Sequence, residues 1–256
     1  MFTPRMIAVL LVAVGLSTAC QREPAKPSPT LDDVVEEVPR ERLYALPGLK
    51  HGLLQSPVNI LSGDAEDGSH KVALNLHDAH PNYLSNTGDT IKLEFPEGST
   101  VSFDGREYEI KQVHFHTPSE HQIDGITYPM ELHVVSSIDP KTADAPPRYL
   151  VFAFLYRMGE ADPFISSFLH QVPEDPGRED LEPGQVYIAD ADRSRIIGDY
   201  YHYRGSLTTP PHTETVDWLI QKHIVQASPE QIRRINVLEG DNARHVQALY
   251  GRRVEH

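Results

Sequence analysis

The stretch KQVHFHTPSEHQIDGITYPMELHVV, residues 111–135, decides the fold and the chemistry expected of this chain. It consists of two extended runs joined by a turn, with His114 and His116 on the first run and His133 on the second. Side chains at positions i and i+2 of a strand point to the same face, so His114 and His116 project together. If the second run pairs antiparallel with the first, His133 joins them.

Three imidazoles that converge on one point, with no fourth protein ligand nearby in the sequence, are typical of a catalytic zinc site with one open position. A His-x-His pair on a strand can also simply face solvent. Gln112 and Glu131 favour the metal, because each lies two residues before a histidine and on that histidine's own face. There each can accept an imidazole N–H and fix the ring tautomer.

The rest of the chain predicts a mostly β domain, because short runs rich in Val, Ile, Leu, Phe and Tyr are separated by Gly, Pro, Asn and Asp. The run YLVFAFLY, residues 149–156, is apolar at nearly every position and is expected to be a central strand covered on both faces. Two helices are predicted, after Asp162-Pro163 and after Ser228-Pro229, where an N-cap residue precedes a proline. The expected strands are 72–77, 83–86, 90–95, 100–103, 107–115, 130–136, 148–157 and 216–225.

The beginning of the sequence predicts export. Residues 1–19 have the pattern of a signal peptide, with Arg5 before a ten-residue apolar core and small residues at 17–19. Cys20 follows Ala19 as in a bacterial lipoprotein signal, but Ser17 stands where such signals usually have leucine. A periplasmic or outer-envelope lipoprotein and a soluble periplasmic or secreted protein therefore both remain open. Residues 20–42, rich in proline and charge, predict a flexible tether before a folded domain at 43–256.

Composition limits the partners. The formal net charge of −14 argues against nucleic acid, which requires a basic face, and against an anionic membrane surface. Membrane contact is expected only through a lipid on Cys20. Because Cys20 is the only cysteine, no intramolecular disulfide can form. The sequence does not fix an oligomeric state.

Several separated motifs then point to one family. They are QSPVNI at 55–60, SNTGDTIKLEF at 85–95, QVHFHTPSEH at 112–121, MELHVV at 130–135, GSLTTPP at 205–211, and NARHVQAL at 242–249. Together with Val216 and Trp218 they resemble the α-class carbonic anhydrases, in their bacterial exported form, and they follow the family order over nearly all of the folded domain.

The resemblance implies a single, mostly β (α+β) domain. A large, mainly antiparallel twisted sheet would carry short peripheral helices, with a zinc ion at the base of a conical cleft. It also implies the reversible hydration of carbon dioxide to bicarbonate and a proton through zinc-bound hydroxide, and an esterase side activity. The alternative is a non-catalytic zinc-binding or ligand-binding module on the same fold.

The resemblance assigns roles residue by residue. It implies that His114, His116 and His133 bind Zn²⁺, with Gln112 and Glu131 supporting them. Thr208 would accept a hydrogen bond from the zinc-bound hydroxide and donate one to Glu120, a pair that a mere zinc-binding protein would not need. Thr209 would border the substrate. The apolar wall for carbon dioxide would comprise Val135, Val151, Leu207, Val216 and Trp218.

Two departures from the family pattern concern proton transfer. Asp89 stands where the family usually has a shuttle histidine. A carboxyl group in water has a pKa of about 3.9, so accepting a proton from a water with a pKa near 7 is uphill by roughly 4 kcal/mol. His212 could substitute at the cleft rim, or be an exposed loop histidine. The segment LYALPGLKHGLL, 43–54, is shorter than in most relatives, and Tyr44 lacks its usual motif. The chain of ordered waters would then differ, or the change would have no catalytic consequence.

Overall fold

The computed structural model describes residues 52–75, 80–140, 142, 146–182, 186 and 198–256. The predicted signal peptide at 1–19, the tether at 20–42 and Tyr44 lie outside these residues, as does the end of the first predicted strand at 76–77. Within the described ranges, no helix is both long and apolar enough to cross a membrane.

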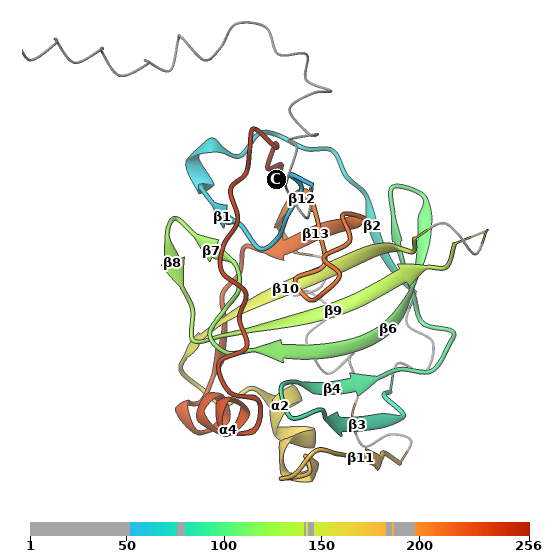
Figure 1. The fold of residues 1–256 in the computed structure, drawn as a ribbon, viewed down its shortest axis with the longest axis vertical. Coiled ribbons are helices and arrows are strands. Elements are labelled where there is room, and N and C mark those ends of the chain that lie inside the picture. Colours follow the sequence, from blue (N-terminus) through green and yellow to red (C-terminus); the bar gives the residue numbers. More distant parts are fainter. Residues whose placement is uncertain (1–51, 76–79, 141, 143–145, 183–185, 187–197) are drawn as a thin grey trace, which may run out of the picture. The chain divides into compact units, whose positions relative to one another are not determined.

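An eleven-stranded sheet organises the described residues (Figure 1). Its main path runs β11-β3-β4-β6-β9-β10-β13-β12; β14 pairs with β10, and β5 joins β2 to β6. The pairs along the path are antiparallel except β10 with β13, and β14 is also parallel to β10. The expected mainly antiparallel sheet is therefore confirmed, and it is mixed at its centre. The strands are β2 (Val72–Asn75), β3 (Tyr83–Asn86), β4 (Ile91–Glu94), β5 (Thr100–Phe103), β6 (Arg106–His116), β9 (Met130–Ile138), β10 (Arg148–Met158), β11 (Gly177–Asp180), β12 (Tyr200–Gly205), β13 (Val216–Gln221) and β14 (Val225–Ala227).

A separate three-stranded sheet has the order β1-β7-β8. Its strands are β1 (Asn59–Ile60), β7 (Gln122–Ile123) and β8 (Ile126–Thr127). The predicted strand 216–225 is divided, since the backbone leaves the sheet between β13 and β14. Strands β1, β7, β8, β11 and β12 were not predicted.

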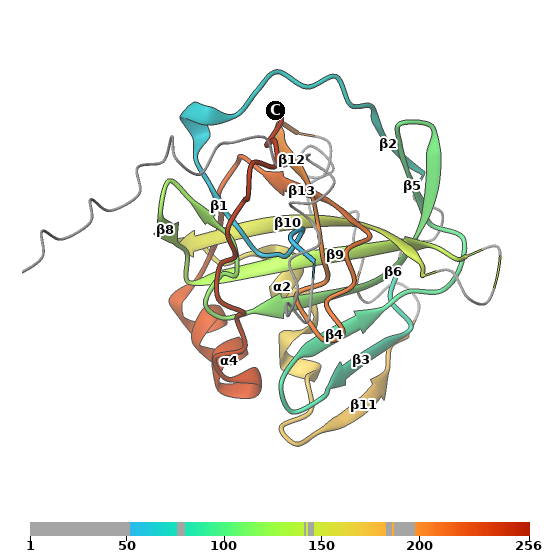
Figure 2. The same cartoon turned by 45° about the horizontal axis from the view of Figure 1, so that its top comes forward.

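Each face of the large sheet buries its own hydrophobic core, and β10 lies between β9 and β13 as expected of a central strand. One core contains Phe115 and Phe152 and is covered by the helices α2 (Pro163–Phe168) and α4 (Pro229–Glu239), which lie on the same side of the sheet in both views (Figures 1 and 2). The other core contains Val151 and Trp218. Short 3₁₀ turns occur at Ser62–Asp64 and Leu169–Gln171.

Both predicted helix caps are formed. The Asp162 carboxylate accepts from the Ile165 N–H at 3.1 Å. Ser228 and Gln231 form a capping box, with Gln231 N donating to Ser228 Oγ at 3.2 Å and Ser228 N donating to Gln231 Oε1 at 3.0 Å. The same Gln231 amide donates to the Asp162 carbonyl at 2.9 Å, so the starts of α2 and α4 are tied together.

A register shift in β6 sets the face to which the histidines point. Between Ile110 and Gln112 the pairing of β6 with β9 slips by one residue, which marks a β-bulge. Ile110 lies in the helix-covered core, and after the bulge so do Val113 and Phe115. Because side chains alternate along a strand, His114 and His116 are thereby turned to the opposite face.

Candidate metal centre

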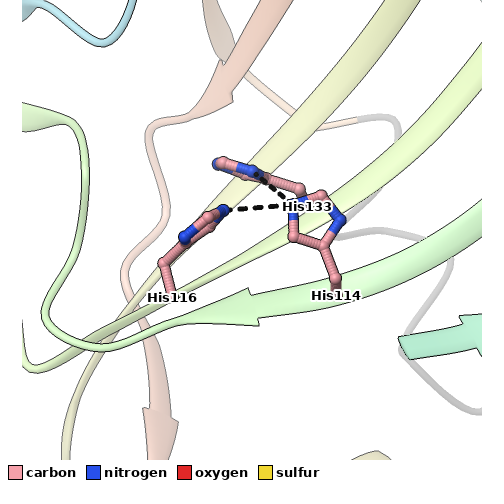
Figure 3. Close-up of side chains that lie close together, drawn as sticks. All are labelled: His114, His116 and His133. Atoms are coloured by element: carbon pink, nitrogen blue, oxygen red, sulfur yellow. Dashed lines mark hydrogen bonds between the residues drawn. The ribbon is translucent and has the colours of Figure 1, made fainter. Parts of the chain in front are cut away.

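The three histidines of the 111–135 stretch meet as the sequence predicts. His114 and His133 are direct cross-strand partners in the pairing of β6 with β9. His114 Nε2 lies 3.1 Å from His116 Nε2 and 3.3 Å from His133 Nδ1, and the three rings point toward one another (Figure 3). Tetrahedral zinc with Zn–N bonds of about 2.0–2.1 Å holds its ligand nitrogens about 3.3 Å apart. The spacing therefore suits a zinc ion.

In His114 and His133, the ring nitrogen that faces away from the cluster determines the tautomer, and so determines whether the nitrogen that faces the cluster carries a lone pair. His114 Nδ1 lies 2.8 Å from Gln112 Oε1, and His133 Nε2 lies 2.7 Å from Glu131 Oε1. An amide oxygen and a carboxylate only accept, so each of these outer nitrogens carries the proton. In the neutral rings, His114 Nε2 and His133 Nδ1 then face each other with lone pairs. Two such acceptors at 3.3 Å repel unless a cation lies between them, so this donor set fits a metal ion.

Burial favours the uncharged form of the histidine rings at this site. Burial lowers the pKa of His114 well below its ordinary value, and the neighbouring His116 and His133 lower it further. Burial also lowers the pKa of His116. Near neutral pH both rings are therefore uncharged, which is the form that binds a metal.

Glu131 is the centre of a buried network. Burial alone would raise the pKa of its carboxyl group, but His121 and His133 together hold it well below its ordinary value. Its Oε2 accepts the backbone N–H groups of Glu120 and His121, each at 2.8 Å. Its Oε1 also bonds the His121 ring at 2.7 Å, and the far side of that ring bonds the Tyr203 hydroxyl at 2.6 Å. The ring of His133 is thus oriented by a chain of bonds that reaches β12.

Glu120 retains one carboxylate oxygen for a further donor. The Arg244 N–H donates to Glu120 Oε1 at 3.0 Å, while the buried Oε2 has no hydrogen-bond partner and lies 3.5 Å from His116 Nε2. Thr208 is buried, but the structure has no hydrogen bond from its hydroxyl to Glu120. The Thr208–Glu120 pair therefore stays a prediction, and Glu120 Oε2 is the oxygen that could accept the bond.

An apolar surface lies beside the histidines on the same face of the sheet. Val135 of β9, Val151 of β10 and Trp218 of β13 are consecutive register partners, and each is two residues from the row that contains His133. The Trp218 ring centroid is 4.9 Å from that of His133. Val216 belongs to the same core, and Leu207 packs against it. The five residues of the predicted apolar wall therefore pack in one core, and Trp218 of this core lies against His133; their role in binding carbon dioxide stays a prediction.

Comparison with known proteins agrees with this geometry. Residues 46–256 match the family model described as "Eukaryotic-type carbonic anhydrase". Over 207 residues the chain is 39% identical to the carbonic anhydrase of Neisseria gonorrhoeae, covering 78% of this chain and 76% of that protein. The chain belongs to the α-class carbonic anhydrases.

Solved structures support the assignment. An α-carbonic anhydrase from Thermovibrio ammonificans, in complex with the inhibitor sulfanilamide, aligns with a TM-score of 0.67 at 33% identity, over 79% of this chain and 86% of that one. Dioscorin complexed with ascorbate shares the fold, with a TM-score of 0.65 at 27% identity, over 78% and 84%. This carbonic anhydrase is an enzyme of a family whose general activity is the hydration of carbon dioxide.

Three further residues singled out in the sequence, Asp89, Thr209 and His212, lie at or near the surface of the carbonic anhydrase domain. Asp89 is exposed, accepts from the Thr87 hydroxyl at 2.6 Å, and is held through its carbonyl by Asn242 at 2.8 Å. Thr209 is exposed on the loop after β12. His212 is half-buried, with Nδ1 3.3 Å from the Leu207 carbonyl, so it is neither fully exposed nor free.

Sequence reasoning did not assign the residues that fasten the loop carrying Thr208 to the QSPVNI motif. Ser56 N donates to Ser206 Oγ and Ser206 N donates to Ser56 Oγ, both at 3.0 Å. The Arg244 guanidinium donates to the Ser56 carbonyl at 2.7 Å. All three residues lie inside motifs that carry the family resemblance. Their place in these motifs is the only sequence feature that could have marked them.

Proposed function

We propose that this carbonic anhydrase hydrates carbon dioxide with Zn²⁺ held by His114 Nε2, His116 Nε2 and His133 Nδ1. The observation that carries the proposal is the approach of these nitrogens to 3.1 and 3.3 Å, while Gln112 and Glu131 accept hydrogen bonds from the outer N–H groups of His114 and His133. When bound, Zn²⁺ supplies hydroxide near neutral pH by lowering the pKa of its water to about 7, a value known for carbonic anhydrases as a family.

The Thr208 hydroxyl has the task of orienting the reacting water. An ionised Glu120 carboxylate can only accept, so a Thr208 hydroxyl that bonds Glu120 Oε2 must donate to it. Its lone pairs are then left to accept from the reacting water. The Arg244 N–H on Glu120 Oε1 supports this role, because it holds the carboxylate with its second oxygen free.

The substrate needs a different surface. Carbon dioxide is neutral and weakly polar, so an apolar wall beside the reacting water binds it better than a charged clamp. The shared face of Val135, Val151 and Trp218 supports this assignment. We assign Val216 and Leu207 to the same wall and Thr209 to its border. Activated esters would reach the same water as a side reaction.

The product proton leaves by a slow route in this proposal. Asp89 is an exposed carboxylate at the shuttle position, and its side chain already accepts from Thr87. Protons would therefore leave chiefly to buffer molecules that enter from solvent.

A non-catalytic binding module on the same fold is the second candidate, because dioscorin, which shares the fold, is found in complex with ascorbate. Purified protein should be stripped with a chelator, reloaded with Zn²⁺, and assayed for carbon dioxide hydration beside His116→Ala and the exposed-histidine control His223→Ala. We expect hydration activity to be lost on chelation and to return with Zn²⁺. Of the two zinc-loaded variants, only His116→Ala should lack activity. Zinc binding without hydration activity would favour the binding module instead.

We also infer export, from the signal-like residues 1–19. The cleavage pattern before Cys20 supports either a lipoprotein or a soluble exported protein. Mass spectrometry of the mature protein from the cell envelope separates the two, since an acylated Cys20 gains the mass of its lipid. A mature chain that still begins at Met1 would contradict export.

A further inference from the structure

A second cluster of histidines and carboxylates lies apart from the three-histidine centre. It comprises His70, His202 of β12 and Glu255, whose nearest ligand atoms all lie within 4.8 Å of one another. His70 Nε2 is 2.7 Å from Glu255 Oε2, and His202 Nδ1 is 3.1 Å from the same oxygen. Two imidazole rings thus contact a single carboxylate oxygen.

The outer nitrogens of these two rings are held as those of metal-binding histidines are. His70 Nδ1 lies 2.7 Å from Asp104 Oδ2, and His202 Nε2 lies 3.3 Å from Asp217 Oδ1. A carboxylate behind a histidine fixes the tautomer and leaves the inner nitrogen to coordinate. Glu131 stands in the same relation to His133 at the first centre.

The backbone builds the cluster rigidly from distant parts of the chain. His202 and Glu255 form an antiparallel bridge, with N–H···O distances of 2.7 and 2.9 Å, so their side chains lie on one face. Glu255 also bridges in parallel to Glu66, four residues before His70. In both ribbon views the C label lies beside β12 (Figures 1 and 2).

Open coordination positions are available. A cavity of about 420 Å³ is lined by all three residues and by Asp199, Lys222 and His256. Without a metal, each contact between a histidine nitrogen and Glu255 Oε2 requires a proton on that nitrogen. Two N–H groups then point at the same carboxylate oxygen. One divalent cation carries the same charge as these two protons, so it can replace them without changing the net charge of the cluster.

We propose that His70, His202 and Glu255 form a second site for a divalent transition-metal ion, of which Zn²⁺ is the simplest case. Two imidazoles and one carboxylate are donors that zinc accepts, with the remaining positions open to the cavity. The ion would clamp residues 254–256 to β12 and to the segment around His70. Metal that binds only the folded chain also stabilises it.

Charged groups of both signs surround the site. Asp104, Asp217 and Asp199 attract a cation, while Lys222 of the cavity wall and protonated histidines repel it. Burial lowers the pKa of His70, but the hydrogen bonds that its ring donates to Glu255 and Asp104 outweigh burial and raise that pKa. Because a histidine ring nitrogen binds a metal only when it carries no proton, binding at this site should tighten as pH rises.

The test is the zinc content of the intact chain after dialysis against micromolar Zn²⁺, measured by elemental analysis. We expect two ions per chain in the wild type and one in both Glu255→Gln and His70→Gln, each with wild-type carbon dioxide hydration. His114→Ala should lose the first ion and keep the second, and His223→Gln should keep both.

A second readout covers a variant that folds poorly. Zinc beyond the first equivalent should raise the Tm of the wild type and of His223→Gln, and leave the Tm of His70→Gln unchanged. One ion per chain in the wild type would overturn the proposal and leave the cluster as an ion-pair network. So would a second ion that persists in both Glu255→Gln and His70→Gln.

Discussion

Replacing Glu131 by glutamine keeps the size of the side chain and removes its charge. Glu131 is fully buried and accepts from His133 and His121 on one oxygen and from two backbone N–H groups on the other. A glutamine that turns its oxygen to the backbone donors points its NH₂ group at His133 Nε2. That nitrogen must then accept, so the ring proton moves to Nδ1, the atom proposed to bind zinc.

The magnitude follows from that inverted tautomer. Losing a partner that orients a metal-binding histidine weakens metal affinity about 10–100-fold, which is about 1.4–2.7 kcal/mol of binding free energy. The metal-free protein should also lose stability, because hydrogen bonds to a charged group contribute roughly 1.5–3 kcal/mol each.

The assay is a competition titration of Zn²⁺ between the protein and a chromophoric chelator, paired with urea unfolding of the metal-free protein. Glu109→Gln, at a half-buried glutamate of β6 that pairs with Lys111, is the matched control and should keep wild-type affinity. An unchanged zinc affinity in a folded Glu131→Gln protein would refute the tautomer argument.

Three further outcomes are expected. Asp89→His should raise turnover in weak buffer, and added imidazole should rescue the wild type; wild-type turnover that ignores buffer concentration would contradict this. Burial raises the pKa of Glu239 to about 8 against its ordinary 4.5, so its stabilising effect is complete below pH 4.5 and is lost as pH rises through 8. Glu239→Gln should therefore gain stability over the wild type as pH rises through that range, by on the order of 5 kcal/mol in urea titrations, and equal pH profiles for the two proteins would count against it. Ser228→Ala should cost about 1 kcal/mol by removing the N-cap of α4, while Ser228→Thr restores most of it.

Local patterns were enough to predict the elements that build the first centre. The i, i+2 spacing of His114 and His116, and the positions of Gln112 and Glu131, follow from strand alternation alone, and the structure forms both predicted contacts. The helix starts at Asp162 and Ser228 were equally local, since a capping residue bonds within three residues of itself.

Contacts between distant segments were out of reach of such patterns. β12 was missed although Tyr201 and Tyr203 alternate with His202 and Arg204, because tyrosine and histidine give a weak apolar period. The bulge in β6 leaves a trace, since the apolar positions change phase between Ile110 and Val113, yet only the pairing with β9 shows which face results.

The roles of Thr208 and Glu120 depend on a loop and a turn whose approach no periodicity encodes. The resemblance supplied that pair, and the structure adds the free oxygen of Glu120. The His70–His202–Glu255 cluster had no sequence signal, because its members come from three segments that lie far apart in the chain and meet only in the folded structure.

The central claim is that this chain hydrates carbon dioxide through a metal at the three histidines, and one measurement tests it most directly. Stopped-flow hydration of carbon dioxide should be followed in strong buffer with the zinc-loaded wild type, then after chelation, and again after Zn²⁺ is restored. We predict catalysis that disappears with the metal and returns with it. Zinc-loaded, folded protein that does not accelerate hydration would contradict the account.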